Sequence, residues 1–231
     1  MNVGYNFFIY IDRKKVAGIM ELNPTLKNII EWGYCILIAI VLALLVRYYL
    51  GTPTIVKQPS MYNTLEPGQR LILTRWNRTF HKDYKRGDIV TFEAPSVAVI
   101  SPFDVDMDKP VAIYKKDPKG FGARFSYYVL ELNKVSYIKR VIGLPGDHVK
   151  IEDGKVYING KELDEPYLRD EITTDGKTFK DIVVPEGYLY VVGDNRPHST
   201  DSREFGCVPI ERIESKVLIR FWPFSKFGGV K

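Results

Sequence analysis

The sequence has little of what several common classes of protein require. Of its 231 residues only two are cysteines, Cys35 and Cys207, too few for a disulfide framework and too isolated for a zinc site. The net charge is only +5, and the basic residues are spread among acidic ones rather than gathered in a block. This scattered charge argues against nucleic acid as a partner. At most, it supports a weak attraction to anionic lipid.

One long uncharged run is present. It extends from Trp32 to Val46 (WGYCILIAIVLALLV), and with its apolar neighbours it predicts a transmembrane anchor over residues 29–50, close to the roughly 20 residues that a bilayer helix requires. A cleavable signal peptide is the competing interpretation. No small-x-small cleavage site follows the run, and the aromatic residues Tyr48 and Tyr49 lie where a membrane interface is expected. We therefore expect a retained single-pass anchor in the cell membrane.

The residues before the anchor, 1–28, are expected to be a cytoplasmic segment. The bias of positive charge that would orient the anchor is small, because basic residues lie on both sides of it: Arg13, Lys14, Lys15 and Lys27 before, and Arg47, Lys57 and Arg70 after. Met20 is a second candidate start, and a chain that begins there loses this bias. The choice between Met1 and Met20 stays open, and we expect the region after the anchor to be extracytoplasmic.

From residue 51 to 231 the sequence predicts a mainly β, antiparallel region. Short β-type runs alternate with turn residues, and the clearest is a hairpin of 148–152 and 155–158 around Asp153-Gly154. Residues 94–134 are predicted to be an insertion with two strands of its own, and residues 150–190 a smaller β subregion. The remaining elements expected are strands at 70–75, 88–93, from 137 onward, 179–184, 188–192 and 217–222, and a helical stretch at 209–215.

A lysine stands in an apolar strand face. In the stretch from Tyr137 to Asp147 (YIKRVIGLPGD), period-two alternation places Lys139 on the same face as Tyr137 and Val141. Burial would lower the lysine pKa from about 10.4, and a fall of roughly 3 units corresponds to about 4 kcal/mol of lost solvation. Such a lysine is a general base at neutral pH. A half-exposed lysine whose amine reaches water is the commoner case, so this hypothesis needs a nucleophile elsewhere.

Two further stretches supply polar groups that suit such a base. Ser60 lies in QPSMYNTL (58–65), and a serine needs an adjacent base, which lysine provides in some hydrolases. The stretch GDNRPHSTDSREFGCVP (193–209) follows an apolar strand, where loops present polar groups to a site. Within it, Ser199 can hydrogen-bond a neutral amine, and Asp201 with Arg203 can form a pair that holds the loop. Either stretch alone is more often an ordinary turn.

Together these three stretches resemble the bacterial type I signal peptidases of the Gram-positive-like, single-anchor form. Ser60-Met61 with Thr64-Leu65 is similar to the family's serine box, Lys139-Arg140 running into Val141 to Asp147 to its lysine box, and residues 193–203 to its GDNRxxSxDSR box. The similarity extends to the anchor, RGDIVTF (86–92), DGKVYINGK (153–161) and FWPFSKFG (221–228). It implies an antiparallel β catalytic region of the signal-peptidase and repressor-protease type.

The resemblance implies a serine endopeptidase that removes signal peptides from secreted preproteins after small residues, with no cofactor and no metal. Ser60 would be the nucleophile and Lys139 the base. The oxyanion would be bound by the backbone N–H of Ser60, aided by Gln58. Ser199 would orient Lys139, while Asp201, Arg203 and Arg140 would hold the loop. Ile55, Val56 and Met61 would lie near the substrate pockets. The histidines His81, His148 and His198 would be bystanders.

Three departures from the family pattern leave alternatives open. Asn63 stands where proline is usual, Gln58 replaces a small or hydroxyl residue, and the insertion at 94–134 is longer than in compact members. These features motivate a non-catalytic or specialised member that binds surface-protein or pilus assembly partners. A cytosolic, self-cleaving protease of the repressor type is a second alternative, but the anchor and the lack of a basic recognition helix argue against it.

Overall fold

The computed structural model describes residues 23–49, 51–62, 64–101, 106, 109–132, 134–168, 174–175 and 177–230. The expectations that concern Arg13, Lys14, Lys15, Met20 and Asn63 therefore lie outside the described residues. By its internal contacts the chain divides into two compact units, Met1–Leu45 and Val46–Lys231, and each is described by itself.

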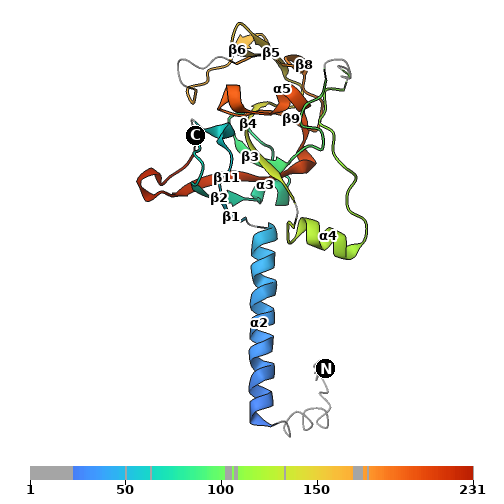
Figure 1. The fold of residues 1–231 in the computed structure, drawn as a ribbon, viewed down its shortest axis with the longest axis vertical. Coiled ribbons are helices and arrows are strands. Elements are labelled where there is room, and N and C mark those ends of the chain that lie inside the picture. Colours follow the sequence, from blue (N-terminus) through green and yellow to red (C-terminus); the bar gives the residue numbers. More distant parts are fainter. Residues whose placement is uncertain are drawn as a thin grey trace, which may run out of the picture. The chain divides into compact units, whose positions relative to one another are not determined.

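Most of the first unit that is described belongs to one helix, α2 (Pro24–Tyr49), drawn in blue in Figure 1. Its start is set by Pro24 in the first position and by Asn23, whose side-chain oxygen accepts a hydrogen bond of 3.0 Å from the Thr25 N–H. The helix is long and apolar enough to cross a membrane, and none of its apolar window is buried. The core helix of a globular protein, by contrast, buries its apolar side chains.

The second unit is built on an antiparallel sheet of seven strands, in the order β1-β2-β11-β3-β4-β9-β10. Expected strands at 70–75, 88–93, from 137 onward, 188–192 and 217–222 are all present, and β1 and β10 are additional strands. The strands are β1 (Pro53–Ile55), β2 (Arg70–Thr74), β3 (Ile89–Glu93), β4 (Ser136–Gly143), β9 (Tyr188–Val192), β10 (Val208–Pro209) and β11 (Ile213–Trp222).

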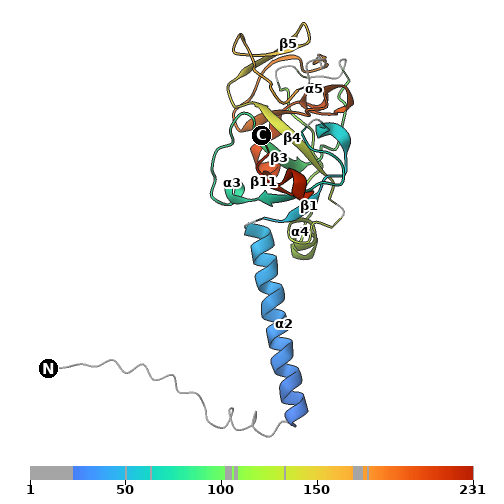
Figure 2. The same cartoon turned by 90° about the vertical axis from the view of Figure 1, so that its left-hand side faces the viewer.

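A second sheet of four strands, in the order β7-β6-β5-β8, contains the expected hairpin. Asp153 and Gly154 both have positive φ, 50° and 75°, as do Asn159 and Gly160, so each pair forms a tight turn of the kind that joins adjacent antiparallel strands. Figures 1 and 2 both show β5 at the end of the unit opposite β1. The strands are β5 (His148–Glu152), β6 (Lys155–Ile158), β7 (Lys161–Glu162) and β8 (Asp181–Val183).

Two expectations about secondary structure were wrong. Residues 209–215 were expected to be helical, but only a single 3-10 turn, η3 (Ile210–Arg212), forms there, and β11 begins at Ile213 because Ile213 and Ser215 pair with β3. The insertion at 94–134 was expected to hold two strands, but among its described residues the regular element is a helix, α4 (Phe121–Tyr128).

The short helices fix the polar segments onto these sheets. Ser60 lies on η1 (Pro59–Met61), whose neighbour Met61 is buried in an apolar cluster with Leu65, Leu71 and Val217. Burying the apolar side of this turn leaves Ser60 directed at β4. The other short helices are α3 (Trp76–Thr79), η2 (Arg196–His198), α5 (Ser202–Phe205) and η4 (Phe224–Lys226).

Candidate active site

The structure brings Ser60 and Lys139 into contact. Lys139 Nζ lies 2.6 Å from Ser60 Oγ, a hydrogen-bond distance, although the two residues are 79 positions apart in the sequence. Lys139 comes from the middle of β4, where its neighbours Ile138 and Arg140 point to the opposite face of the sheet. The two side chains are 5% and 2% exposed, so they meet in a site largely closed to bulk water.

Burial changes the acidity of the lysine. Loss of solvation lowers the pKa of Lys139 to about 8, and the nearby carboxylates of Asp201 and Asp194 only partly oppose this effect. The Arg203 guanidinium acts in the same direction as burial. The neutral amine, which can accept a proton from the Ser60 hydroxyl, is therefore far more populated near neutral pH than it would be in a solvated lysine.

The Ser60 turn is docked against the loop that follows β9. The Asn195 N–H donates to Ser60 O over 3.0 Å, the Asn195 side-chain amide donates to Pro59 O over 3.0 Å, and the Asp194 N–H approaches Met61 Sδ at 3.4 Å. These contacts fix the backbone of η1 and hence the direction of the Ser60 side chain.

Gly193 lies where no side chain fits. A Cβ at this position would stand 2.2 Å from Ser199 Oγ and 2.5 Å from Ser60 O. Its backbone N–H donates to Asp201 Oδ2 over 3.1 Å. The glycine therefore allows the Ser60 turn and the Ser199 segment to pack against the same point of the backbone.

Asp201 and Arg203 form the pair expected from the sequence. Arg203 donates from Nε and Nη2 to the two Asp201 oxygens over 2.8 and 2.9 Å, and Asp201 also caps α5 by accepting from the Arg203 N–H. Burial opposes ionisation of Asp201, but the hydrogen bonds and charge of Arg203 outweigh it and lower the Asp201 pKa. Arg203 also donates to the backbone oxygens of Arg196 and Ser199. The pair thus fixes the conformation of the loop at 196–203 through buried hydrogen bonds.

The Arg140 side chain lies on the face of β4 opposite to that of Lys139. It donates to both Asp194 oxygens over 2.9 and 2.7 Å and to Gly87 O over 3.0 Å, and its guanidinium lies 3.8 Å from the centroid of the Tyr167 ring. Thr64 Oγ1 donates to the same Asp194 carboxylate. Arg140 therefore links the strand of Lys139 to the loop that carries Gly193 and Asn195.

Sequence reasoning assigned no role to Asp194, Asn195, Thr64 or Arg196. Arg196 is 1% exposed and is held by Glu165 and Thr174, from the segment that precedes β8. The boxes quoted for the family contained Thr64, Asp194, Asn195 and Arg196. Glu165 and Thr174 lie in a polar stretch with no periodicity, and nothing in the sequence pairs them with Arg196.

Similarity to known proteins extends over most of the chain and is not limited to this site. The sequence model of a family described as signal peptidase, peptidase S26, matches residues 29–222. The chain belongs to this signal peptidase family. Signal peptidase I T of Bacillus subtilis is 33% identical over 210 residues, covering 87% of this chain and 90% of the relative. Signal peptidase IB of Staphylococcus aureus (strain COL) is 33% identical over 218 residues, covering 87% and 93%.

One solved structure is also similar. A signal peptidase I from Enterococcus faecalis V583 is 28% identical, with a TM-score of 0.38, and the match covers 58% of this chain and 97% of the other. The mainly antiparallel β fold and the assignment as a signal peptidase enzyme, expected from the sequence, are confirmed.

In this signal peptidase, Ser60 and Lys139 open onto a cleft of about 350 Å³. Gln58 is exposed at the edge of the cleft, and its side chain does not cap η1. His198, expected to be a bystander, is exposed at the same edge. The lining residues are Gln58, Pro59, Ser60, Tyr137, Lys139, His198 and Thr200.

The residues expected to orient Lys139 or to contact substrate occupy different environments. Ser199 is buried, and its hydroxyl lies near Asp201, whose pKa it helps to lower. Val56 and Met61 are buried in the apolar cluster beneath η1, whereas Ile55 is 51% exposed at the end of β1. The orienting role of Ser199 and the substrate roles of these three residues remain predictions.

Proposed function

We propose that this signal peptidase is a membrane-anchored serine endopeptidase with a Ser60-Lys139 dyad, which removes signal peptides from preproteins by cleaving after small residues. The single observation that carries the proposal is the 2.6 Å contact between Ser60 Oγ and a buried Lys139 amine whose pKa is lowered to about 8. A non-catalytic scaffold has no need of a buried lysine beside a serine hydroxyl, because burying an amine costs stability.

The proposed reaction uses the two side chains in turn. The neutral Lys139 amine accepts the Ser60 proton as Oγ attacks the scissile carbonyl, and the resulting ammonium returns the proton to the leaving amine. An ester on Ser60 remains. Water then attacks it, again losing a proton to Lys139, and the carboxylate product leaves with Oγ protonated once more. A buried site supports this cycle because the lowered pKa of Lys139 makes the neutral amine available more often than for a solvated lysine.

Groups beside the dyad are suited to stabilise the oxyanion and to hold substrate. The Ser60 N–H belongs to the first turn of η1, where backbone N–H groups have no acceptor within the helix, and the exposed Gln58 amide can donate from the cleft edge. β1 is an edge strand that leads into η1, so an extended peptide can pair beside Ser60. Ser199, packed on Gly193, is proposed to orient Lys139.

The proposed arrangement in the cell has a cytoplasmic segment at 1–28, an anchor at 29–50 and an extracytoplasmic catalytic region at 51–231. The length and apolar surface of α2 support the anchor. Signal peptides carry an apolar segment that partitions into the bilayer, so an anchored enzyme meets them at a raised effective concentration.

The test is cleavage of a reporter with a small-x-small signal peptide by the detergent-solubilised full chain, with product masses recorded. Ser60→Ala and Lys139→Ala should each lower kcat/KM at least about 10³-fold, because each removes one half of the proton transfer. Ser136→Ala, an exposed serine on the same strand as Lys139, and Lys180→Ala, an exposed lysine, serve as matched controls and should cleave normally. A folded wild-type chain as inactive as both dyad variants would overturn the proposal.

A further inference from the structure

The insertion displays apolar side chains that nothing in the described chain covers. On α4, Phe121 is 87% exposed and Phe125 is 39% exposed, and their rings stack with centroids 6.2 Å apart. Arg124 is exposed between them. Burying two phenyl rings is favourable, so their display at the surface indicates an occupant. Figures 1 and 2 both show α4 outside the two sheets, at the same end of the unit as β1.

A hollow of about 590 Å³ lies beside these rings. Its lining combines aromatic rings with two guanidinium groups: Tyr48, Arg78, Phe121, Arg124, Phe125 and Tyr128. Arg78 lies 5.6 Å from the centroid of the Tyr48 ring, and among the described residues neither Arg78 nor Arg124 has a carboxylate within salt-bridge distance. The nearby Asp117 pairs with Arg212 at 2.8 Å, and Asp117 also lies near enough to Arg124 for the Arg124 charge to help lower its pKa. The hollow therefore offers positive charge next to an apolar surface.

Within the second unit (Val46–Lys231), contacts join the chain around α4 to the residues that follow the apolar run. Glu131 accepts from Arg47 over 2.8 Å and also pairs with the buried Arg75. Arg47 is the first charged residue after the uncharged run that ends at Val46, so in an anchored chain it marks the boundary between lipid and water. Since Tyr48 lines the hollow, Phe121 and Phe125 belong at the same boundary.

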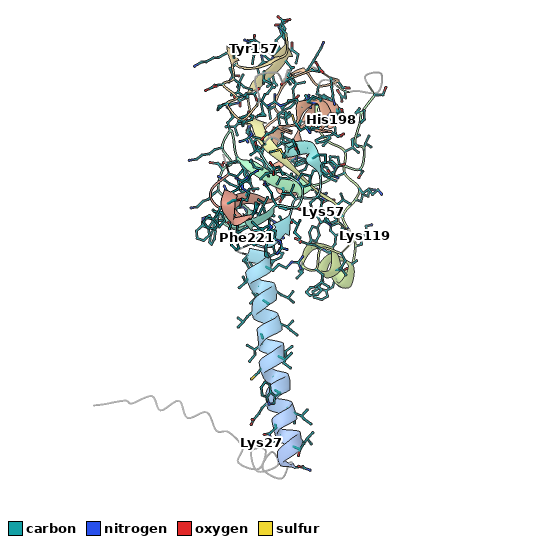
Figure 3. All side chains as sticks on the ribbon, turned by 60° about the vertical axis from the view of Figure 1, so that its left-hand side comes forward. Lys27, Lys57, Lys119, Tyr157, His198 and Phe221 are labelled. Carbon is teal, nitrogen blue, oxygen red and sulfur yellow. The ribbon has the colours of Figure 1, made fainter. Side chains whose placement is uncertain are left out.

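We propose that α4 and this hollow form a second membrane contact, in which the guanidinium groups of Arg78 and Arg124 bind the headgroup phosphate of an anionic phospholipid while Phe121 and Phe125 enter the acyl boundary. The segment 115–124 (KKDPKGFGAR) adds three lysines against one aspartate, and Figure 3 labels Lys119 beside α4. An apolar helix face flanked by basic residues is suited to an anionic membrane surface. The inference rests on the anchor under the proposed function.

Such a contact would restrain the catalytic unit. A single helix permits rotation about its own axis, whereas a second attachment point restricts that rotation. The dyad would then be held at a defined height above the bilayer, and activity on membrane-bound substrates would depend on anionic lipid.

The test uses the full chain with Cys35→Ser, incorporated into lipid nanodiscs of phosphatidylcholine with or without phosphatidylglycerol. A fluorescent label is attached to Ala123→Cys on α4, or to Lys161→Cys on β7 as a matched control, and headgroup-spin-labelled lipid serves as the quencher. Cys207 is buried and does not compete for the label. We expect the label at 123 to be quenched at least about twofold more than the label at 161, and more strongly with phosphatidylglycerol.

Charge variants identify the groups responsible. Arg78→Gln with Arg124→Gln should remove the dependence on phosphatidylglycerol, whereas Lys150→Gln with Lys155→Gln, which removes the same charge from the smaller sheet, should preserve it. Equal quenching at 123 and 161, or equal effects of the two double variants, overturns the inference. Incorporation with normal cleavage but without quenching would overturn this inference alone, whereas failure to enter nanodiscs would overturn the proposed anchor with it.

Discussion

Lys139 is the residue on whose ionisation the proposed chemistry depends. Because burial lowers its pKa to about 8, the neutral amine is the minority form below that pH and the majority form above it. With the neutral amine as the base, kcat/KM should rise about tenfold per unit below pH 8 and level off above it. Reporter cleavage between pH 5.5 and 10 measures this, with circular dichroism as the control for folding. A rate that still climbs at pH 10 would show that the lysine is solvated.

Arg203 and Asp201 supply the second prediction at this scale. Both side chains are buried, so Arg203→Met would leave Asp201 as an unpaired buried charge and lower the free energy of unfolding by about 3–5 kcal/mol. The deficit should shrink as the pH falls, because burial without the arginine raises the Asp201 pKa and protonation then removes the charge. Unfolding of the detergent-solubilised chain by denaturant would measure this.

The matched control for the Arg203 variant is the double variant Asp201→Asn with Arg203→Met. It leaves no buried charge, so it should lose less stability than Arg203→Met alone. A double variant as unstable as the sum of both single changes would contradict the account of the pair as one unit.

At the residue scale, alternation along a single strand was enough to place Lys139 on an apolar face, but it left a half-exposed lysine as the commoner case. The partners of Lys139 came from the resemblance, since no local pattern relates position 60 to position 139. Asp194 and Asn195 were visible as letters of a box, but their contacts to the Ser60 turn depend on how η1 packs in three dimensions. Pairs such as Arg196 with Glu165 require a contact that local sequence does not encode.

At the scale of elements, η1 packs closely against the loop after β9 at Gly193. Gly193→Ala would place a methyl group against Ser60 O and Ser199 Oγ, and the backbone of η1 would have to move. We expect about a hundredfold loss of kcat/KM and a loss of about 1–3 kcal/mol of stability. Reporter cleavage and unfolding measure the two effects. Gly229→Ala, which meets nothing within 4 Å, is the control, and equal activity of both variants would refute the packing argument.

The elements that sequence predicted best were those with strong local signals. The Asp153-Gly154 turn, flanked by β-type runs, yielded the β5-β6 hairpin because positive φ suits these residues. The helix expected at 209–215 was wrong because pairing of Ile213 and Ser215 with β3 overrides a weak local preference. α4 was missed because its sequence, FGARFSYY, contains a glycine and adjacent tyrosines that do not favour a helix.

At the scale of the whole molecule, the prediction concerns the sides of the membrane. In intact spheroplasts, a membrane-impermeant maleimide should label Lys161→Cys in the catalytic region and should label Lys27→Cys only after permeabilisation. Both variants carry Cys35→Ser, and the buried Cys207 should stay unlabelled. Labelling of both positions before permeabilisation would contradict a single-pass anchor. Labelling of Lys27→Cys alone would reverse the proposed orientation, which the small difference in flanking charge only weakly favoured.

The order of strands in the large sheet also bears on when the protein becomes active during its synthesis. β11 lies between β2 and β3, so it joins the part of the sheet next to Ser60 to the part that carries Lys139. Among the described strands, β11 is also the last in sequence order and therefore the last of them to be translated. A nascent chain still lacking β11 would contain both Ser60 and Lys139 but no completed sheet to hold them together, so we expect the proposed peptidase activity only after β11 has joined the sheet.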